Sequence, residues 1–172
     1  VELKMFANLP SKDECRLKIN LPKNKKIIGY IGRFENMGKE KGITELIKAV
    51  AEIYDTNNQV LLICVGGPMS QVPQHKKIMQ EFNLSGEQIQ FFDHQPFFSI
   101  PFWIRACDVV TIPWPWIEFS AYYTSPLKLF EYMASLVPIV ASDLPSLREI
   151  LNEKNAILVK AGNPEALAEG IK

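Results

Sequence analysis

The chain has 172 residues, 47% of them apolar and 22% charged, and its 19 basic side chains balance 19 acidic ones. This composition is that of one globular domain with a sizeable core, and it excludes a disordered, fibrous or membrane-spanning protein. A chain without net charge or a long run of like charges has no broad field for polyanions, so nucleic acid is not an expected partner.

The first predicted element is a short helix at 12–18, because Ser11 and Glu14 have capping-box spacing and Leu21-Pro22 ends it. Residues 1–25 are therefore predicted to form an interdomain linker with one short helix. From residue 26 onward, apolar strands alternate with helices. The predicted strands span 26–31, 60–65, 90–92, 109–112, 139–141 and 157–159, and the predicted helices span 43–54, 76–82, 101–106, 126–135, 146–151 and 164–172.

Strands this short, apolar and non-alternating are typical of a sheet that helices cover on both faces. The sequence therefore predicts an α/β fold over 26–172: a doubly wound, mostly parallel Rossmann-like sheet of about six strands with helices on both faces. Ligands bind such sheets at the carboxyl ends of the strands. We expect the loops after Ile31, Val65, Phe92 and Ile112 to share one edge.

Cysteine and histidine usage gives no sign of a metal site. Cys15, Cys64 and Cys107 are widely spaced, and two of them stand in apolar stretches, so we expect buried reduced thiols in a cytoplasmic protein. His75 and His94 lie apart without a zinc-ligand pattern. We predict no metal and no other cofactor.

The densest basic cluster is Lys23, Lys25 and Lys26, directly before a predicted strand. A solvated loop explains this cluster, and peripheral attachment to the inner face of a membrane is the alternative. Because the chain starts with Val1, lacks a signal peptide and stops within a predicted helix, we expect it to be part of a longer protein.

Two cations follow the first predicted strand. Arg33 comes directly after Gly32, and Lys41 stands with Gly42 before the helix at 43–54. An arginine fork and a lysine ammonium can together clamp a diphosphate, and the helix start adds free amides and a positive dipole end. The alternative is a pair of solvated charges on a loop.

A more specific pattern is the stretch 124–134, TSPLKLFEYMA. Ser125 is a good N-cap and Pro126 a good first helical residue. The amides of Leu127 and Lys128 are then expected to face outward without intrahelical partners. They would form a seat for an anion.

Glu131 lies further along the same predicted helix, about 9 Å from its cap at a rise of about 1.5 Å per residue. Its carboxylate can accept hydrogen bonds from two ribose hydroxyls when the phosphate occupies the anion seat. The alternative is a surface pair with Lys128. Phe130, Tyr132 and Met133 leave little of this helix solvated, which favours a cleft.

Taken together, these motifs resemble the C-terminal domain of family 4 of the retaining glycosyltransferases, or glycosyl transferases group 1. The resemblance runs from about Lys26 to the end of the chain, with the motifs in the family's order. It is carried by Gly32-Arg33, Lys41-Gly42, Val65-Gly66-Gly67-Pro68, Ala106-Cys107-Asp108-Val109, the stretch 125–134 and Pro138-Ile139-Val140-Ala141-Ser142.

The resemblance implies a two-domain enzyme of the GT-B architecture, a hexosyltransferase of polysaccharide biosynthesis. Its C-terminal half would bind a nucleotide-diphosphate sugar, UDP- or GDP-linked, without a metal ion. The N-terminal half, absent from this chain, would bind a glycan or lipid-linked acceptor. The fragment alone is therefore expected to be inactive.

By position, the resemblance gives Arg33 and Lys41 the catalytic role of neutralising the diphosphate. The loop 93–96 would flank the base, mostly through its backbone, and Glu131 would hold the ribose. The implied donor-binding residues are Gly32, His94, Gln95, Ser125, Leu127, Lys128 and Glu131.

One departure concerns the transferred sugar. The family's widespread motif has two glutamates separated by seven residues, but Tyr123 stands where the first glutamate is expected. Contact with the donor sugar then falls to Tyr123, or to Glu118 if the loop folds back. The aromatic loop 114–123 is explained by a core or an interface with the missing domain, or by stacking on a sugar or lipid-linked acceptor.

Two other functions fit the same architecture. A nucleotide-sugar epimerase would convert the donor without any acceptor. A non-catalytic nucleotide-sugar-binding module would keep the sheet but lose Arg33 or Glu131, and both residues are present.

Overall fold

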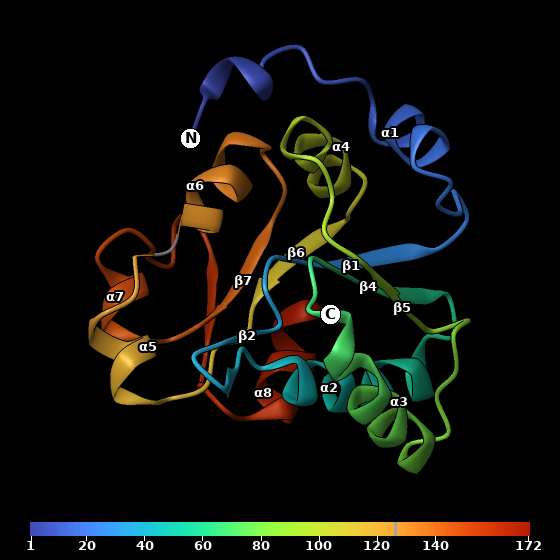
Figure 1. Cartoon of the computed structure of the whole chain (residues 1–172), viewed down its shortest axis with the longest axis vertical. Helices are drawn as coiled ribbons and strands as arrows, with labels where there is room; N and C mark the ends of the chain where they lie inside the picture. The colour runs from blue at the N-terminus through green and yellow to red at the C-terminus, as the bar shows by residue number, and fades with distance from the viewer. Residues whose placement is uncertain (126) are drawn as a thin grey trace.

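The computed structural model describes residues 1–125 and 127–172. Its six main strands are β1 Lys26–Ile31, β4 Val60–Val65, β5 Ile89–Phe92, β6 Val109–Ile112, β7 Ile139–Ser142 and β8 Ile157–Val159. They form a parallel sheet of order β5-β4-β1-β6-β7-β8, and a separate hairpin joins β2 Glu35–Asn36 to β3 Lys39–Glu40 (Figure 1). The predicted doubly wound α/β fold is confirmed.

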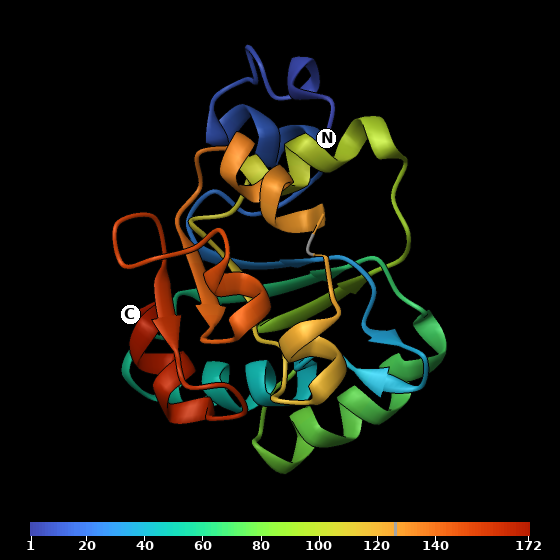
Figure 2. The same cartoon turned by 90° about the vertical axis from the view of Figure 1, so that its left-hand side faces the viewer.

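Helices cover both faces of the sheet (Figure 2). The helices are α1 Lys12–Lys18, α2 Ile43–Thr56, α3 Val72–Glu81, α4 Ile100–Arg105, α5 Glu118–Tyr122, α6 Leu127–Ala134, α7 Pro145–Arg148 and α8 Pro164–Ile171. Ile27 and Ile31 of β1 enter the core beneath α1, α4 and α6, whereas Ile28 and Tyr30 enter the core beneath α2, α3 and α8. Both faces of β1 are therefore buried, which explains its unbroken apolar sequence.

The strand order reverses between β1 and β6. Along β1 the chain pairs with β4 at every residue, but its pairing with β6 stops at Gly29, opposite Val110. β1 and β6 therefore separate at their carboxyl ends, at the point where the strand order reverses. Open α/β sheets bind their ligands in a crevice at this position.

Most element boundaries follow the sequence prediction. The helix α1 and the strands β1, β4, β6 and β8 have the predicted limits. Helix α3 begins four residues earlier than predicted, at Val72 rather than Lys76. The β2–β3 hairpin and α5 were not predicted, because two-residue strands have no periodicity and α5 lies within the aromatic stretch. Pro126 lies outside the described residues.

The amino-terminal segment contacts the opposite edge of the sheet, where β1 and β6 begin. Arg16 is 3% exposed, and its guanidinium donates to Asp108 at 2.6 Å and to the Ala106 carbonyl at 2.8 Å. Asp108 also accepts from the amide of Ile27 at 2.7 Å and from Lys12 at 2.5 Å. These contacts join α1 to the amino ends of β1 and β6.

The three thiols, Cys15, Cys64 and Cys107, are buried and unpaired, in agreement with the sequence prediction. Across residues 1–125 and 127–172, no helix has the length and apolar character needed to cross a bilayer.

Gly42 provides a test of how the start of α2 is held. Its φ is +83°, and an added Cβ would lie 1.7 Å from the carbonyl oxygen of Pro113. We expect Gly42→Ala to lower the free energy of unfolding by about 3 kcal/mol, from the clash and the left-handed backbone together, in denaturant titrations. Gly38→Ala is the control, because Gly38 has φ +73° and nothing within 4 Å. It should cost only about 1 kcal/mol, and equal losses would contradict the clash.

Candidate functional site

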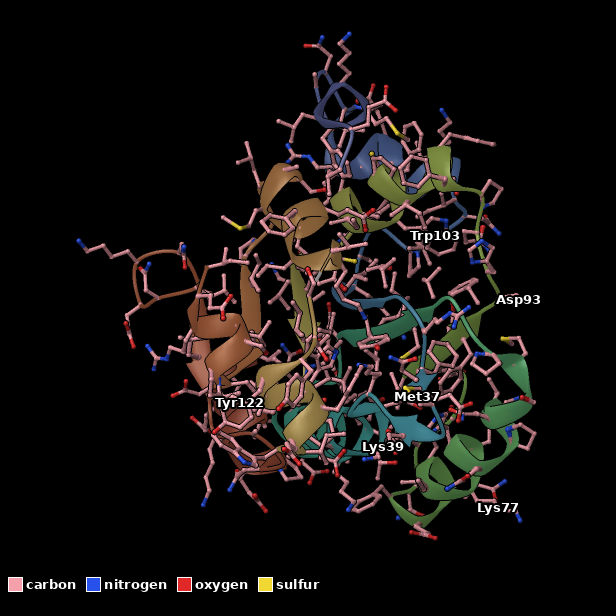
Figure 3. All side chains as sticks on the ribbon, turned by 60° about the vertical axis from the view of Figure 1, so that its left-hand side comes forward. Met37, Lys39, Lys77, Asp93, Trp103 and Tyr122 are labelled. Atoms are coloured by element: carbon pink, nitrogen blue, oxygen red, sulfur yellow. The ribbon has the colours of Figure 1, made fainter. Side chains whose placement is uncertain are left out.

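A pocket of about 840 Å³ opens at the carboxyl edge of the sheet. The loops after β1, β4 and β5 line it together with the start of α6, which confirms that these loops share one edge. Figure 3 labels two of the lining residues, Asp93 on the loop after β5 and Met37 at the tip of the hairpin. Of the predicted site residues, this pocket contains Gly32, Arg33, His94, Gln95, Leu127, Lys128 and Glu131.

A smaller pocket of about 420 Å³ adjoins the first and shares Arg33, Asn36, Leu127 and Lys128 with it. It adds Lys41, Trp114, Thr124 and Ser125. The two pockets thus bring the early cations to the same side of the sheet as Glu131. Tyr123 and Glu118 are exposed and line neither pocket, so their contact with a donor sugar stays a prediction.

Lys128 crosses the end of β1 by passing over Gly32. A Cβ at Gly32 would lie 2.4 Å from Nζ of Lys128, so only glycine leaves room for this path. The ammonium donates to the hydroxyl of Tyr30 at 3.1 Å and lies 4.2 Å from the centre of the Tyr30 ring. The Tyr30 hydroxyl in turn donates to the carbonyl oxygen of Arg33 at 2.5 Å.

Lys41 lies near Lys128, and both ammonium groups are close to the ring of Trp114. Its side chain is buried, and its ammonium is 4.5 Å from the Trp114 ring centre and 5.7 Å from that of Phe119. The Lys128 ammonium lies 5.8 Å from the same Trp114 ring. Aromatic faces attract cations without neutralising them. Within the described part of the chain, neither lysine nor Arg33 takes part in an ion pair.

Burial is the largest cause of the pKa shifts in this cluster. The pKa of Lys128 is lowered to about 7, chiefly by burial and then by the neighbouring Lys41, while Glu131 opposes the change. Burial likewise lowers the pKa of Lys41 and raises that of the Glu131 carboxyl, against the effect of Lys128. Two desolvated ammonium groups side by side repel each other, so an anion between them would relieve that repulsion.

The start of α6 differs in one respect from the predicted anion seat. The amide of Leu127 donates to the carbonyl oxygen of Ser125 at 3.1 Å, so it is not free as the sequence suggested. Arg33, Lys41 and Lys128 bring side-chain positive charge to the same edge.

The loop after β5 forms the other end of the larger pocket. The amide of His94 donates to the Asp93 carboxylate at 2.6 Å, and the side-chain amide of Gln95 donates to the Asp93 carbonyl at 3.0 Å. The loop is thus closed by its own hydrogen bonds. The cis peptide bond between Gly67 and Pro68 lies in the neighbouring loop of the same pocket.

Several site residues were not singled out by sequence reasoning. Glu35, Asn36 and Met37 of the hairpin line the larger pocket, and Tyr30 was counted only as a strand residue. Glu40 accepts from the amide and the hydroxyl of Thr44 at 2.5 and 2.7 Å, which fixes the start of α2 beside Lys41. A tyrosine near the end of a buried strand was the available signal, because its hydroxyl needs a partner.

The aromatic stretch divides into a buried and an exposed part. Trp114 is 2% exposed and supports the two ammonium groups, whereas Trp116, Tyr122 and Tyr123 are 57%, 60% and 69% exposed. Packing therefore explains Trp114.

Known proteins resemble this chain over nearly its whole length. The family model described as "Glycosyl transferases group 1" matches residues 25–172. A putative teichuronic acid biosynthesis glycosyltransferase of Bacillus subtilis is 24% identical over 99% of this chain, which spans 39% of that protein. Among solved structures, a sucrose-phosphate synthase from Thermosynechococcus elongatus is similar over 99% of this chain and 40% of its own, with TM-score 0.79 and 27% identity. HepE of Anabaena, in complex with UDP and glucose, gives TM-score 0.80 and 22% identity over 98% of this chain and 44% of its own.

The buried charge of Lys128 makes a testable difference to stability. Its pKa is about 7 in the fold against an ordinary 10.5, so the folded state binds fewer protons than the unfolded state between these values. Stability therefore rises with pH across that window, and below it the fold bears the full cost of the buried ammonium. We expect Lys128→Met to be more stable than the wild type by about 3 kcal/mol at pH 6, with an advantage that shrinks above pH 7.

Denaturant titrations at several pH values measure this advantage. Lys77→Met is the matched control, because Lys77 is exposed on α3 and should show no such dependence (Figure 3). A Lys128→Met variant that is less stable than the wild type at pH 6 would show that the ammonium is not a destabilising charge.

Proposed function

The chain belongs to the glycosyl transferases group 1 family, and on that basis we propose that it binds the nucleotide-diphosphate sugar of a glycosyltransferase. The observation that carries the proposal is the convergence of Arg33, Lys41 and Lys128 on two adjoining pockets, the larger of which also holds Glu131. Among the described residues, none of these three cations forms an ion pair. Three cations suit a diphosphate, and one carboxylate suits a ribose diol.

Each part of the donor can be assigned to one or both of the two pockets. Glu131 and the loop 93–95 line only the larger pocket, where the nucleoside would lie. Arg33 and Lys128 line both pockets, where the diphosphate would lie, and Lys41 lines only the smaller one. The transferred sugar would then point toward the smaller pocket, which Trp114 and Thr124 also line.

We propose that catalysis rests on electrostatic stabilisation of the departing nucleoside diphosphate. Arg33, Lys41 and Lys128 would offset the charge that develops on the phosphate oxygens, in the place of a divalent cation. Aromatic rings hold the ammonium groups of Lys41 and Lys128 in position, so little reorganisation of these two groups would accompany the reaction. Transfer with retention of the anomeric configuration, and a UDP- or GDP-linked donor, belong to the same proposal.

The chain spans 39% of the Bacillus relative and 40% of the synthase, so the acceptor site is assigned to the remaining part of such proteins. We propose a glycan or lipid-linked acceptor. Peripheral association with a membrane would belong to that complete protein. An assay with nucleotide sugar alone distinguishes transfer from epimerisation, because only an epimerase converts its substrate without an acceptor.

Removing either catalytic cation tests the mechanism. We expect Arg33→Ala and Lys41→Ala to lower kcat by about 100-fold in a full-length protein carrying this chain, since each contributes to the charge opposite the leaving group. Steady-state kinetics with a nucleotide sugar and circular dichroism of the fold provide the measurement. Lys39→Ala is the control, because Lys39 lies exposed on the hairpin. Unchanged turnover in both variants would remove the proposed role.

The ribose assignment is tested by binding to the chain itself. We expect Glu131→Ala to weaken UDP binding by about tenfold in calorimetric titrations, because two hydrogen bonds to a carboxylate are lost. Glu118→Ala should bind as the wild type does, since Glu118 lines neither pocket. Titration with GDP and ADP in parallel identifies the base. Equal UDP affinity in Glu131→Ala would place the ribose elsewhere.

A further inference from the structure

Two buried tyrosines link β1 and α6 in opposite directions. Tyr30 of β1 reaches α6 through its hydrogen bond from the Lys128 ammonium. Tyr132 of α6 reaches β1, where its hydroxyl accepts from the amide of Ile31 at 2.9 Å and donates to the Ile31 carbonyl at 3.2 Å. Both side chains are 0% exposed, and neither was assigned a role by the family resemblance or by the proposed function.

The contact made by Tyr132 replaces a missing strand pairing. β1 and β6 separate after Gly29, so the amide and carbonyl of Ile31 have no partner on β6. One phenolic hydroxyl satisfies both groups, because it donates and accepts at once. Buried peptide groups without partners are costly, so this hydroxyl allows the strands to open where a ligand enters.

The contact made by Tyr30 connects the cations. Its hydroxyl accepts from Lys128 and donates to the Arg33 carbonyl, and its ring lies beneath the Lys128 ammonium. A single side chain thereby sets the backbone at Arg33 and the head group of Lys128 relative to each other. Tyr132 sets the separation of the elements that carry them.

We propose that Tyr30 and Tyr132 are positioning residues that form a reciprocal clasp between β1 and α6 and hold Arg33 and Lys128 at the spacing of a diphosphate. Side chains fixed by such contacts lose little further freedom when a donor binds. Its role in donor binding rests on the proposed function, whereas its effect on Lys128 does not.

The effect on Lys128 can be measured without any ligand, by NMR titration of the lysine side chain. The charged groups around Lys128 are Lys41 and Glu131, and Tyr30 supplies its hydrogen-bond acceptor. Tyr30→Phe keeps the ring but removes the acceptor that stabilises the charged form, so the titration midpoint should fall by about one pH unit from its value near 7. Tyr132→Phe should also move the midpoint, because α6 shifts relative to Tyr30.

Tyr54→Phe is the matched control, since Tyr54 lies on α2 and packs against the core beneath α2, α3 and α8, away from the clasp. A purely structural role would lower the melting temperature without moving the Lys128 midpoint. An unchanged midpoint in both Tyr30→Phe and Tyr132→Phe would therefore overturn the clasp.

The binding of UDP and of uridine distinguishes the role of Tyr30 from that of Tyr132. We expect Tyr30→Phe to weaken UDP binding by about tenfold and leave uridine binding unchanged, because uridine lacks the phosphates. Tyr132→Phe should weaken both, since Glu131 moves together with Lys128 on α6. If the wild-type chain binds no nucleoside diphosphate, the proposed function fails, and the midpoint alone then decides the clasp.

Discussion

Everything at the carboxyl edge depends on two lysine ammonium groups held side by side on aromatic faces rather than on carboxylates. Lys41 and Lys128 share the Trp114 ring, and Lys128 also lies over Tyr30. A carboxylate in these places would neutralise the charge and compete with an incoming phosphate. An aromatic ring supplies attraction through its quadrupole but no countercharge, so the cations keep their affinity for an anion.

The sheet topology explains why this arrangement forms here. Strand β1 lies at the reversal of strand order, and β6 leaves it after Gly29. The opening exposes the end of β1 to α6, whose Lys128 passes over Gly32 from one face of the sheet to the other. The same opening leaves peptide groups to be satisfied, and Tyr132 satisfies them. The position of Lys128 and the contact of Tyr132 are therefore two consequences of one break in the ladder.

The sequence was informative where a pattern repeats and weaker where contacts are made across the chain. The apolar runs located β1, β4, β6 and β8 to the residue, and the Ser11 capping box located α1. The site residues could be grouped because parallel strands end at one edge. The prediction of a free Leu127 amide was wrong, because helix-capping rules do not anticipate its hydrogen bond to the Ser125 carbonyl. The use of Tyr30 and Trp114 as supports for cations could not be predicted, since their partners lie 98 residues away or on another loop.

Among the described residues, buried charge is paired at the amino edge of the sheet and has no counterion at the carboxyl edge. This contrast distinguishes a structural charge from a functional one. At the amino edge, Asp108 is half-buried but receives Lys12, Arg16 and the Ile27 amide, and these partners hold its pKa below the ordinary value despite burial. That carboxylate is fully satisfied within the chain and joins α1 to the sheet. At the carboxyl edge, burial without a counterion drives the pKa of Lys128 down to about 7. Folding alone gains little from a buried ammonium without a counterion, which favours the proposed role of Lys128 in binding an anion.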